Sequence, residues 1–127
     1  MSSNIRFLNT PQNFFSMHLV ILESPYAGQI LRNTTYMRRC LRDSLDRGES
    51  PIAFHGLYTQ PNVLNNFIEE ERKRAIQAAS AWYSQAHKIV VYVDYDISAG
   101  MLAGIALATS LLKPVVYRSI GKNDEIE

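Results

Sequence analysis

The sequence has a single cysteine, Cys40, among its 127 residues. One cysteine cannot build an intrachain disulfide framework or a cysteine-based metal site. No apolar run approaches the ~20 residues of a membrane span, and the first residues lack the apolar core of a signal sequence. The formal net charge is only +1, without the strong basic excess of many nucleic-acid-binding domains. We therefore expect a cytoplasmic protein with no membrane and no nucleic-acid partner.

The common catalytic and nucleotide-binding signatures are also absent. The chain contains no GxGxxG, GxxxxGK[ST], HExxH or GxSxG pattern. Its histidines, at positions 18, 55 and 87, are too far apart to act as metal ligands from one element. We expect no metal and no cofactor.

Hydrophobic patterning indicates an α/β domain. Apolar runs at 18–22, 51–55, 88–95 and 114–118 have the length of buried strands. Between them, 33–48, 67–87 and 99–112 have helical character, with Asn33 or Thr34 as the expected cap of the first helix and Ser98 as that of the last. Alternating strands and helices predict a parallel sheet of four to five strands with helices on both faces. We place an N-terminal arm at 1–17, the domain at 18–120 and a tail at 121–127.

The last predicted helix lacks a polar face. Residues 101–112 are almost all Leu, Ile, Met, Ala or Gly. A helix that is apolar all round is buried on all sides. In a domain of this size a second subunit provides that burial most easily, so we expect a homo-oligomer through this helix. The alternative is burial beneath the N-terminal arm.

Polar residues follow three of the predicted strands. Ligands of open parallel sheets bind beyond the carboxyl ends of the strands. The candidates there, and in the loop and helix that follow, are Glu23, Ser24, Tyr26, Gly28, His55, Tyr58, Asp94, Asp96, Ser98, Gly100 and Met101. Glu23, Asp94 and Asp96 are the catalytic candidates, and the others, with Asp94, are expected to bind a ligand.

Each candidate also has a purely structural interpretation. Glu23 would then cap a turn or accept an arginine, and His55 would be an ordinary loop residue. The two aspartates would be turn formers ahead of Ser98. It is the convergence of these residues on one sheet edge that favours a binding site.

Several segments resemble a family found mainly in phages and bacteria that is distantly related to the nucleoside 2-deoxyribosyltransferases. They are "ILESPYAG", "RDSLDRGESPIAFHGLYTQPNVL", "EERKRAIQAASAW", "VVYVDYDISAGM" and "PVVYRSI". The resemblance implies a flavodoxin-like sheet and a nucleoside or nucleotide pocket at its carboxyl edge. It places Tyr26 in the loop that helps to hold the nucleoside.

The resemblance fails at the catalytic carboxylates. The nucleophilic glutamate that it implies on the last helix falls at Gly104, and the accompanying aspartate falls near Ala79. Neither residue supplies a carboxylate to the sugar. The usual mechanism therefore does not transfer residue by residue.

Three functions remain open at this point. The first is a nucleotide- or nucleoside-binding protein, of phage origin, that sequesters or senses its ligand without cleaving it. The second is an N-glycosidase or deoxyribosyltransferase-like enzyme that uses Glu23, Asp94 or Asp96. The third is an oligomeric interaction module with a vestigial cleft.

Overall fold

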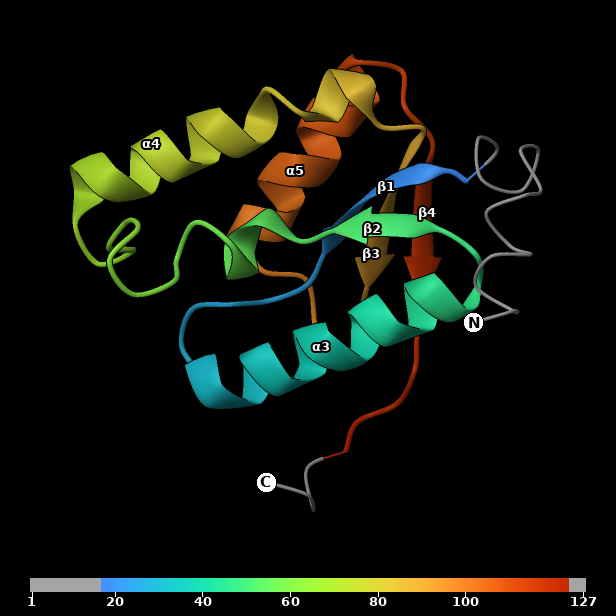
Figure 1. Cartoon of the computed structure of the whole chain (residues 1–127), viewed down its shortest axis with the longest axis horizontal. Helices are drawn as coiled ribbons and strands as arrows, with labels where there is room; N and C mark the ends of the chain where they lie inside the picture. Colours follow the sequence, from blue (N-terminus) through green and yellow to red (C-terminus); the bar gives the residue numbers. More distant parts are fainter. Residues whose placement is uncertain (1–16, 124–127) are drawn as a thin grey trace, which may run out of the picture.

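The structure is a computed structural model that describes residues 17–123 (Figure 1). A single parallel sheet of four strands runs through it in the order β2-β1-β3-β4. The strands are β1 (Leu19–Glu23), β2 (Ser50–Ile52), β3 (Lys88–Tyr92) and β4 (Val115–Arg118). The predicted N-terminal arm lies outside the described residues, apart from its last residue.

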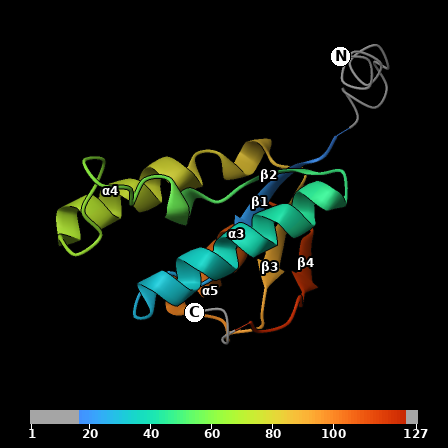
Figure 2. The ribbon, with the colours of Figure 1, turned by 60° about the horizontal axis from the view of Figure 1, so that its bottom comes forward.

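Helices cover both faces of the sheet. The helices are α3 (Ile30–Asp46), α4 (Glu69–Ser80) and α5 (Ala99–Ser110), joined by the short 3-10 turns η1 (Phe54–Gly56) and η2 (Tyr83–Gln85). In Figure 2, α3 lies on one side of the strands and α5 lies behind them. This arrangement confirms the predicted α/β class with a parallel sheet.

Alternation along the strands divides the core into two halves. Val20 and Leu22 of β1 pack with Tyr36 and Cys40 of α3. Ile21, the residue between them, packs in the other half. The α5 half of the core consists of Ile21, Phe54, Tyr83, Ala86, Ile89, Val91, Met101 and Ala108. Successive side chains of a strand point to opposite faces, so Glu23 shares the α5 side with Ile21.

Several predicted boundaries shift. Helix α3 begins at Ile30, and Asn33 lies inside it instead of capping it. The Asn33 side chain donates to the carbonyl oxygens of Tyr26 and Ala27, at 2.9 and 3.3 Å. An amide in the first turn of a helix thus holds the preceding loop in place. The predicted helix over 67–87 ends at Ser80, and the chain continues through η2.

A buried ion-pair network joins three elements on the α3 side. Glu49, only 6% exposed, accepts from both Nη atoms of Arg118, at 2.8 and 2.6 Å. Its carboxylate also accepts from Ser44 Oγ at 2.7 Å and pairs with Lys88 Nζ at 2.8 Å. The hydrogen bonds from Arg118, together with those from Lys88 and Ser44, lower the pKa of Glu49 to about 2 in spite of burial. This cluster fixes the end of α3 to β3 and β4.

Helix α5 is only partly covered within the described chain. Met101, Gly104 and Ala108 face the sheet and are buried. On the outer side, Leu102 is 56% exposed, and Leu112, just beyond the helix, is 90% exposed. The expected burial by a second subunit therefore remains a prediction, and burial under the arm concerns residues outside the described range.

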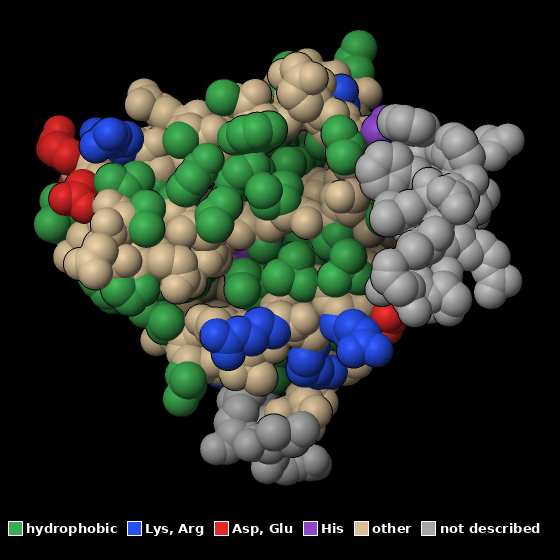
Figure 3. Space-filling view, viewed as in Figure 1, with side chains coloured by type: hydrophobic (Ala, Val, Ile, Leu, Met, Phe, Trp, Pro, Cys, Tyr) green, Lys and Arg blue, Asp and Glu red, His purple; other side chains and the backbone are tan. Residues whose placement is uncertain are grey.

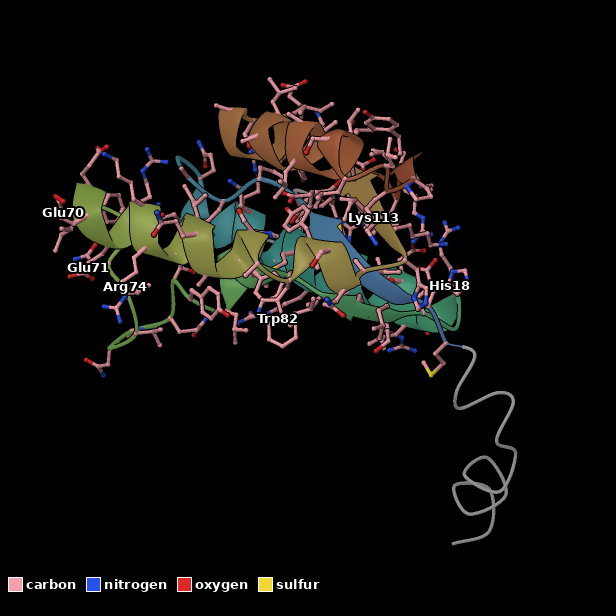
Figure 4. All side chains as sticks on the ribbon, turned by 90° about the horizontal axis from the view of Figure 1, so that it is seen from above. His18, Glu70, Glu71, Arg74, Trp82 and Lys113 are labelled. Carbon is pink, nitrogen blue, oxygen red and sulfur yellow. The ribbon has the colours of Figure 1, made fainter. Side chains whose placement is uncertain are left out.

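Helix α4 projects from the domain. None of its residues is buried. Figure 4 shows Glu70, Glu71 and Arg74 at its outer end and Trp82 at the inner end. Trp82 stacks on Phe54 with ring centroids 6.0 Å apart, and Phe54 stacks in turn on Tyr58 at 5.5 Å. These contacts place the inner end of α4 beside η1.

Candidate functional site at the carboxyl edge of the sheet

The strand order changes direction between β1 and β3. The chain proceeds outward from β1 to β2, and later from β3 to β4. Ligand sites in open parallel sheets lie at such a switch point, beyond the carboxyl ends of the strands. The loop after β1, residues 24–29, and the loop after β3, residues 93–98, flank this point.

Glu23 is the last residue of β1 and projects toward α5. Its Oε2 accepts a hydrogen bond from the phenol of Tyr83 in η2. Burial raises the pKa of Glu23 to about 7, and the Tyr83 hydrogen bond only partly offsets that effect. Among the described residues, no cation forms an ion pair with Glu23. The carboxylate is thus held by one neutral donor in a desolvated position.

Gly104 makes room for this carboxylate. A Cβ on Gly104 would lie 2.8 Å from Glu23 Cδ and 2.8 Å from Tyr83 Oη, with Glu23 Oε2 closer still. All three contacts are too short for any side chain. The head of Glu23 therefore occupies the space into which a residue at position 104 would project.

Ser24 and His55 form a second pair beside Glu23. Ser24 Oγ lies 2.7 Å from His55 Nε2. Burial lowers the pKa of His55 to about 4, so the imidazole is neutral at pH 7. Ser24 is only 3% exposed. The pair ties the loop after β1 to η1 and leaves the serine enclosed, and the predicted ligand-binding roles of both residues remain predictions.

Asp94 binds the C-terminal segment. Its carboxylate accepts from Tyr36 Oη at 2.6 Å and from the backbone N–H groups of Ile120 and Gly121, at 2.9 and 2.7 Å. Burial alone would raise the pKa of Asp94, but these bonds and one from Ser119 lower it to about 2. The geometry favours a structural role over the catalytic and ligand-binding roles that the sequence predicts.

This role leads to a stability prediction. Asp94→Asn removes the negative charge and replaces one acceptor oxygen with an amide donor that faces other donors, so it should lower the free energy of unfolding by about 1–3 kcal/mol at pH 7. Because the folded pKa is depressed, the contribution of Asp94 is present above its ordinary pKa of 3.8 and disappears as pH falls toward about 2. Urea unfolding at pH 7 and pH 2.5 measures the difference. An equal difference at both pH values would contradict the assignment.

The remaining candidates occupy different surroundings. Ser98 accepts from the Met101 backbone N–H at 3.3 Å, which confirms it as the cap of α5. Met101 is 1% exposed and belongs to the core, and its backbone N–H is already bound to Ser98 Oγ, so the structure favours a packing role for it. Gly28 has φ +93, and Asp96 has φ +75. Both therefore shape turns, and their predicted roles remain predictions.

A groove adjoins the loop after β1. Its volume is about 350 Å³, and it is lined by Tyr26, residues 59–67 and Glu71. Four of the lining side chains are amides: Gln60, Asn62, Asn65 and Asn66. Tyr58 lies in a neighbouring depression with Val63, Leu64, Arg74 and Ala78. Figure 3 shows hydrophobic side chains gathered over the middle of the molecule, above a row of basic residues.

Sequence reasoning missed Tyr83 and only partly anticipated Gly104. Tyr83 is 60 positions from Glu23 in the chain, and nothing in its local sequence marks it as a partner. A signal for Glu23 did exist. Glu23 lies two residues after Ile21 on the same strand, so both side chains point to the face that the last helix covers.

Sheet order and helical layers define a flavodoxin-like α/β protein with its candidate site at the carboxyl edge. The chain belongs to the family described as a domain of unknown function, DUF7768, which its residues 18–118 match. A structure of a 2-deoxyribosyltransferase from Bacillus psychrosaccharolyticus is similar, with a TM-score of 0.58 and 17% identity over 83% of this chain and 74% of that chain. A likeness at this identity shows the fold alone. A search of curated proteins found no match.

The described residues contain no group of three or more His, Cys, Asp or Glu that would hold a metal ion. No helix in residues 17–123 is long and apolar enough to cross a membrane.

Proposed function

We propose that this protein binds a nucleoside or nucleotide at the carboxyl edge of the sheet, with the base beside Tyr26. The observation that carries the proposal is the groove lined by Tyr26 together with four amide side chains. Two of these amides, Gln60 and Asn65, also make one hydrogen bond each to the backbone. Aromatic rings stack on bases, and amides present donors and acceptors that match the edges of bases. The groove volume of about 350 Å³ falls within the range of small-molecule sites.

The spacing along the chain supports the same placement. Glu23 and Tyr26 are separated by three residue steps, which span at most about 10 Å. Tyr26 is therefore within about 10 Å of the end of β1 along the backbone, and Glu23 itself does not line the groove. The similarity in fold to a 2-deoxyribosyltransferase agrees with a nucleoside as ligand.

The test measures binding of deoxyadenosine, deoxycytidine, thymidine and their 5′-monophosphates by isothermal titration calorimetry. Tyr26→Ala should weaken binding of the best ligand about tenfold or more, because base stacking contributes about 1–3 kcal/mol. Tyr117→Ala is the control, since Tyr117 is an exposed tyrosine of β4 that does not line the groove. Equal losses in both variants, or no binding by the unmodified protein, would overturn the proposal. The second outcome would favour the interaction module.

Sequestering or sensing a nucleotide requires binding alone. Binding with cleavage requires a carboxylate at the sugar. The enzyme alternative would need one of the candidate carboxylates, Glu23, Asp94 or Asp96, at the sugar.

A further inference from the structure

We infer that Glu71 selects the base of the bound nucleoside and that this base is guanine, whose two adjacent N–H donors match the two oxygens of one carboxylate. The inference rests on the proposed nucleoside binding and adds the identity of the base to it. It is carried by a carboxylate that lines the same groove as Tyr26 and has one oxygen open.

Glu71 is the charged residue of the groove. The other described residues that line the groove are Tyr26 and the uncharged residues of the loop 59–67. Within residues 17–123, no lysine, arginine or histidine forms an ion pair with Glu71. A carboxylate accepts hydrogen bonds without donating any. The groove therefore offers a charged acceptor that the described chain does not neutralise.

The chain holds Glu71 in place through one of its two oxygens. Oε1 accepts from the backbone N–H of Asn65 at 2.6 Å, which joins the first turn of α4 to the loop that forms the groove. No described residue donates to Oε2. Glu71 is partly buried, whereas Glu69 and Glu70 of the same turn are exposed. A fixed carboxylate with one open oxygen is suited to bind a donor group of a ligand.

The chemistry of the bases singles out guanine as the partner of a carboxylate. The Watson–Crick edge of guanine carries two adjacent donors, N1–H and the 2-amino group, one for each carboxylate oxygen. Adenine and cytosine place an amino group beside a ring nitrogen that only accepts, and its lone pair repels the second oxygen. Thymine has one N–H between two carbonyl oxygens. The same carboxylate thus attracts guanine and disfavours the other bases.

Two amides of the groove remain available for the acceptors of guanine. Gln60 and Asn65 are engaged with the backbone. Asn62 and Asn66 also line the groove, and their side chains form no hydrogen bond with any described residue. Guanine presents O6 and N7 as two further acceptors, and amide N–H groups donate to such atoms. The groove therefore supplies partners to both the donors and the acceptors of guanine.

The test measures the affinities of 2′-deoxyguanosine, 2′-deoxyinosine and 2′-deoxyadenosine, and of their 5′-monophosphates, for the unmodified protein by isothermal titration calorimetry. The base of deoxyinosine keeps N1–H and O6 but lacks the 2-amino group, so it isolates one hydrogen bond to the carboxylate. Deoxyguanosine should bind at least about tenfold more tightly than deoxyinosine, because a hydrogen bond to a charged group is lost. It should exceed deoxyadenosine by at least as much.

Glu71→Gln should shift the preference from guanine toward adenine. The variant keeps a carbonyl oxygen for the Asn65 N–H and presents an amide NH2 in place of Oε2. That group donates, so it opposes the 2-amino group of guanine and suits N1 of adenine. The ratio of the deoxyguanosine affinity to the deoxyadenosine affinity should fall at least about tenfold, with deoxyadenosine bound more tightly than before. Tighter binding of one ligand cannot result from a damaged fold.

Glu70→Gln is the matched control. It is the same carboxylate-to-amide change in the same turn of α4, at a residue that does not line the groove. The variant should leave the affinities for all three bases unchanged. An equal shift of preference in Glu70→Gln would mean that the overall charge of α4 selects the base, and would overturn the contact assigned to Glu71.

The remaining outcomes separate this inference from the proposed function. If the unmodified protein binds none of these nucleosides or nucleotides, both are overturned. Binding with equal affinities for the three bases overturns the selection of guanine and leaves the proposed function intact. A preference for guanine that persists in Glu71→Gln, or an equal loss for all three bases in that variant, overturns the role of Glu71.

Discussion

Replacing Glu49 with alanine is expected to lower the free energy of unfolding by about 3–5 kcal/mol, the typical cost of removing one partner of a buried ion pair. Arg118 is 9% exposed and loses its bidentate acceptor, while Lys88 loses its counter-charge. Without the Glu49 carboxylate, the buried guanidinium retains its hydrogen bond to Tyr92 Oη at 3.1 Å, and that neutral partner does not compensate the buried charge. Urea denaturation at pH 7 measures the loss as a lower midpoint with an unchanged slope.

The control is a carboxylate of the same helix end that lies in solvent. Asp46 pairs with Arg42 at 3.0 Å, with side chains 63% and 79% exposed. Asp46→Ala should cost no more than about 1 kcal/mol, since water solvates both groups and salt screens them. A Glu49 variant that is no less stable than the Asp46 variant would contradict the assigned role of the network.

The network also predicts acid sensitivity. The folded pKa of Glu49 is lowered from 4.5 to about 2, so its contribution is present above pH 4.5 and is lost as pH falls toward 2. The stability difference between the unmodified protein and Glu49→Ala should shrink over that interval. A difference that stays constant down to pH 2 would mean that the charge of Glu49 is not what stabilises the fold.

Substitution of alanine for Gly104 should have the second large effect, because the added methyl group competes with the Glu23 carboxylate for one space. A Cβ there meets Glu23 Cδ and Tyr83 Oη, each at 2.8 Å. Overpacking of this kind costs about 1–3 kcal/mol, although alanine by itself favours a helix over glycine by about 1 kcal/mol. We expect a net loss of stability in the otherwise unmodified protein.

A double-mutant cycle identifies the cause. In the Glu23→Ala background the carboxylate is gone and Tyr83 is free to move from its former acceptor, so Gly104→Ala should become neutral or stabilising. The change of sign is the expected coupling between the two positions. Gly100→Ala provides the matched glycine control on α5, where the nearest atom to a Cβ is Ser98 Oγ at 4.0 Å. Equal costs of Gly104→Ala in both backgrounds would show that Glu23 does not fill the space.

The α/β class followed from the sequence because it depends on local patterns. Apolar runs of strand length alternate with helical segments, and that alternation admits few arrangements other than a parallel sheet covered by helices. The cap of α5 at Ser98 was equally local, since a serine before an apolar helix satisfies its first N–H groups. The polar strand ends also converge on one edge, because parallel strands share their carboxyl ends.

Local patterns predicted the start of α3 less well. Asn33 has the residue type of a helix cap, but its amide reaches back to the carbonyl oxygens of the loop and lies inside the helix. Met101 was a candidate ligand residue because of its place in the chain, yet its side chain completes the core. In both cases a tertiary contact overrode the expectation from the neighbouring sequence.

The sequence by itself determined the layered α/β fold, the edge at which polar residues gather, and the absence of a carboxylate at position 104. Only the tertiary structure decided which of the carboxylates at that edge accept hydrogen bonds from other parts of the chain. Asp94 is occupied by the C-terminal segment, whereas Glu23 meets Tyr83 from a turn 60 positions away in the space beside Gly104. The reason is physical: the protonation and availability of a carboxylate depend on burial and on donors from distant parts of the chain, which a local pattern does not encode.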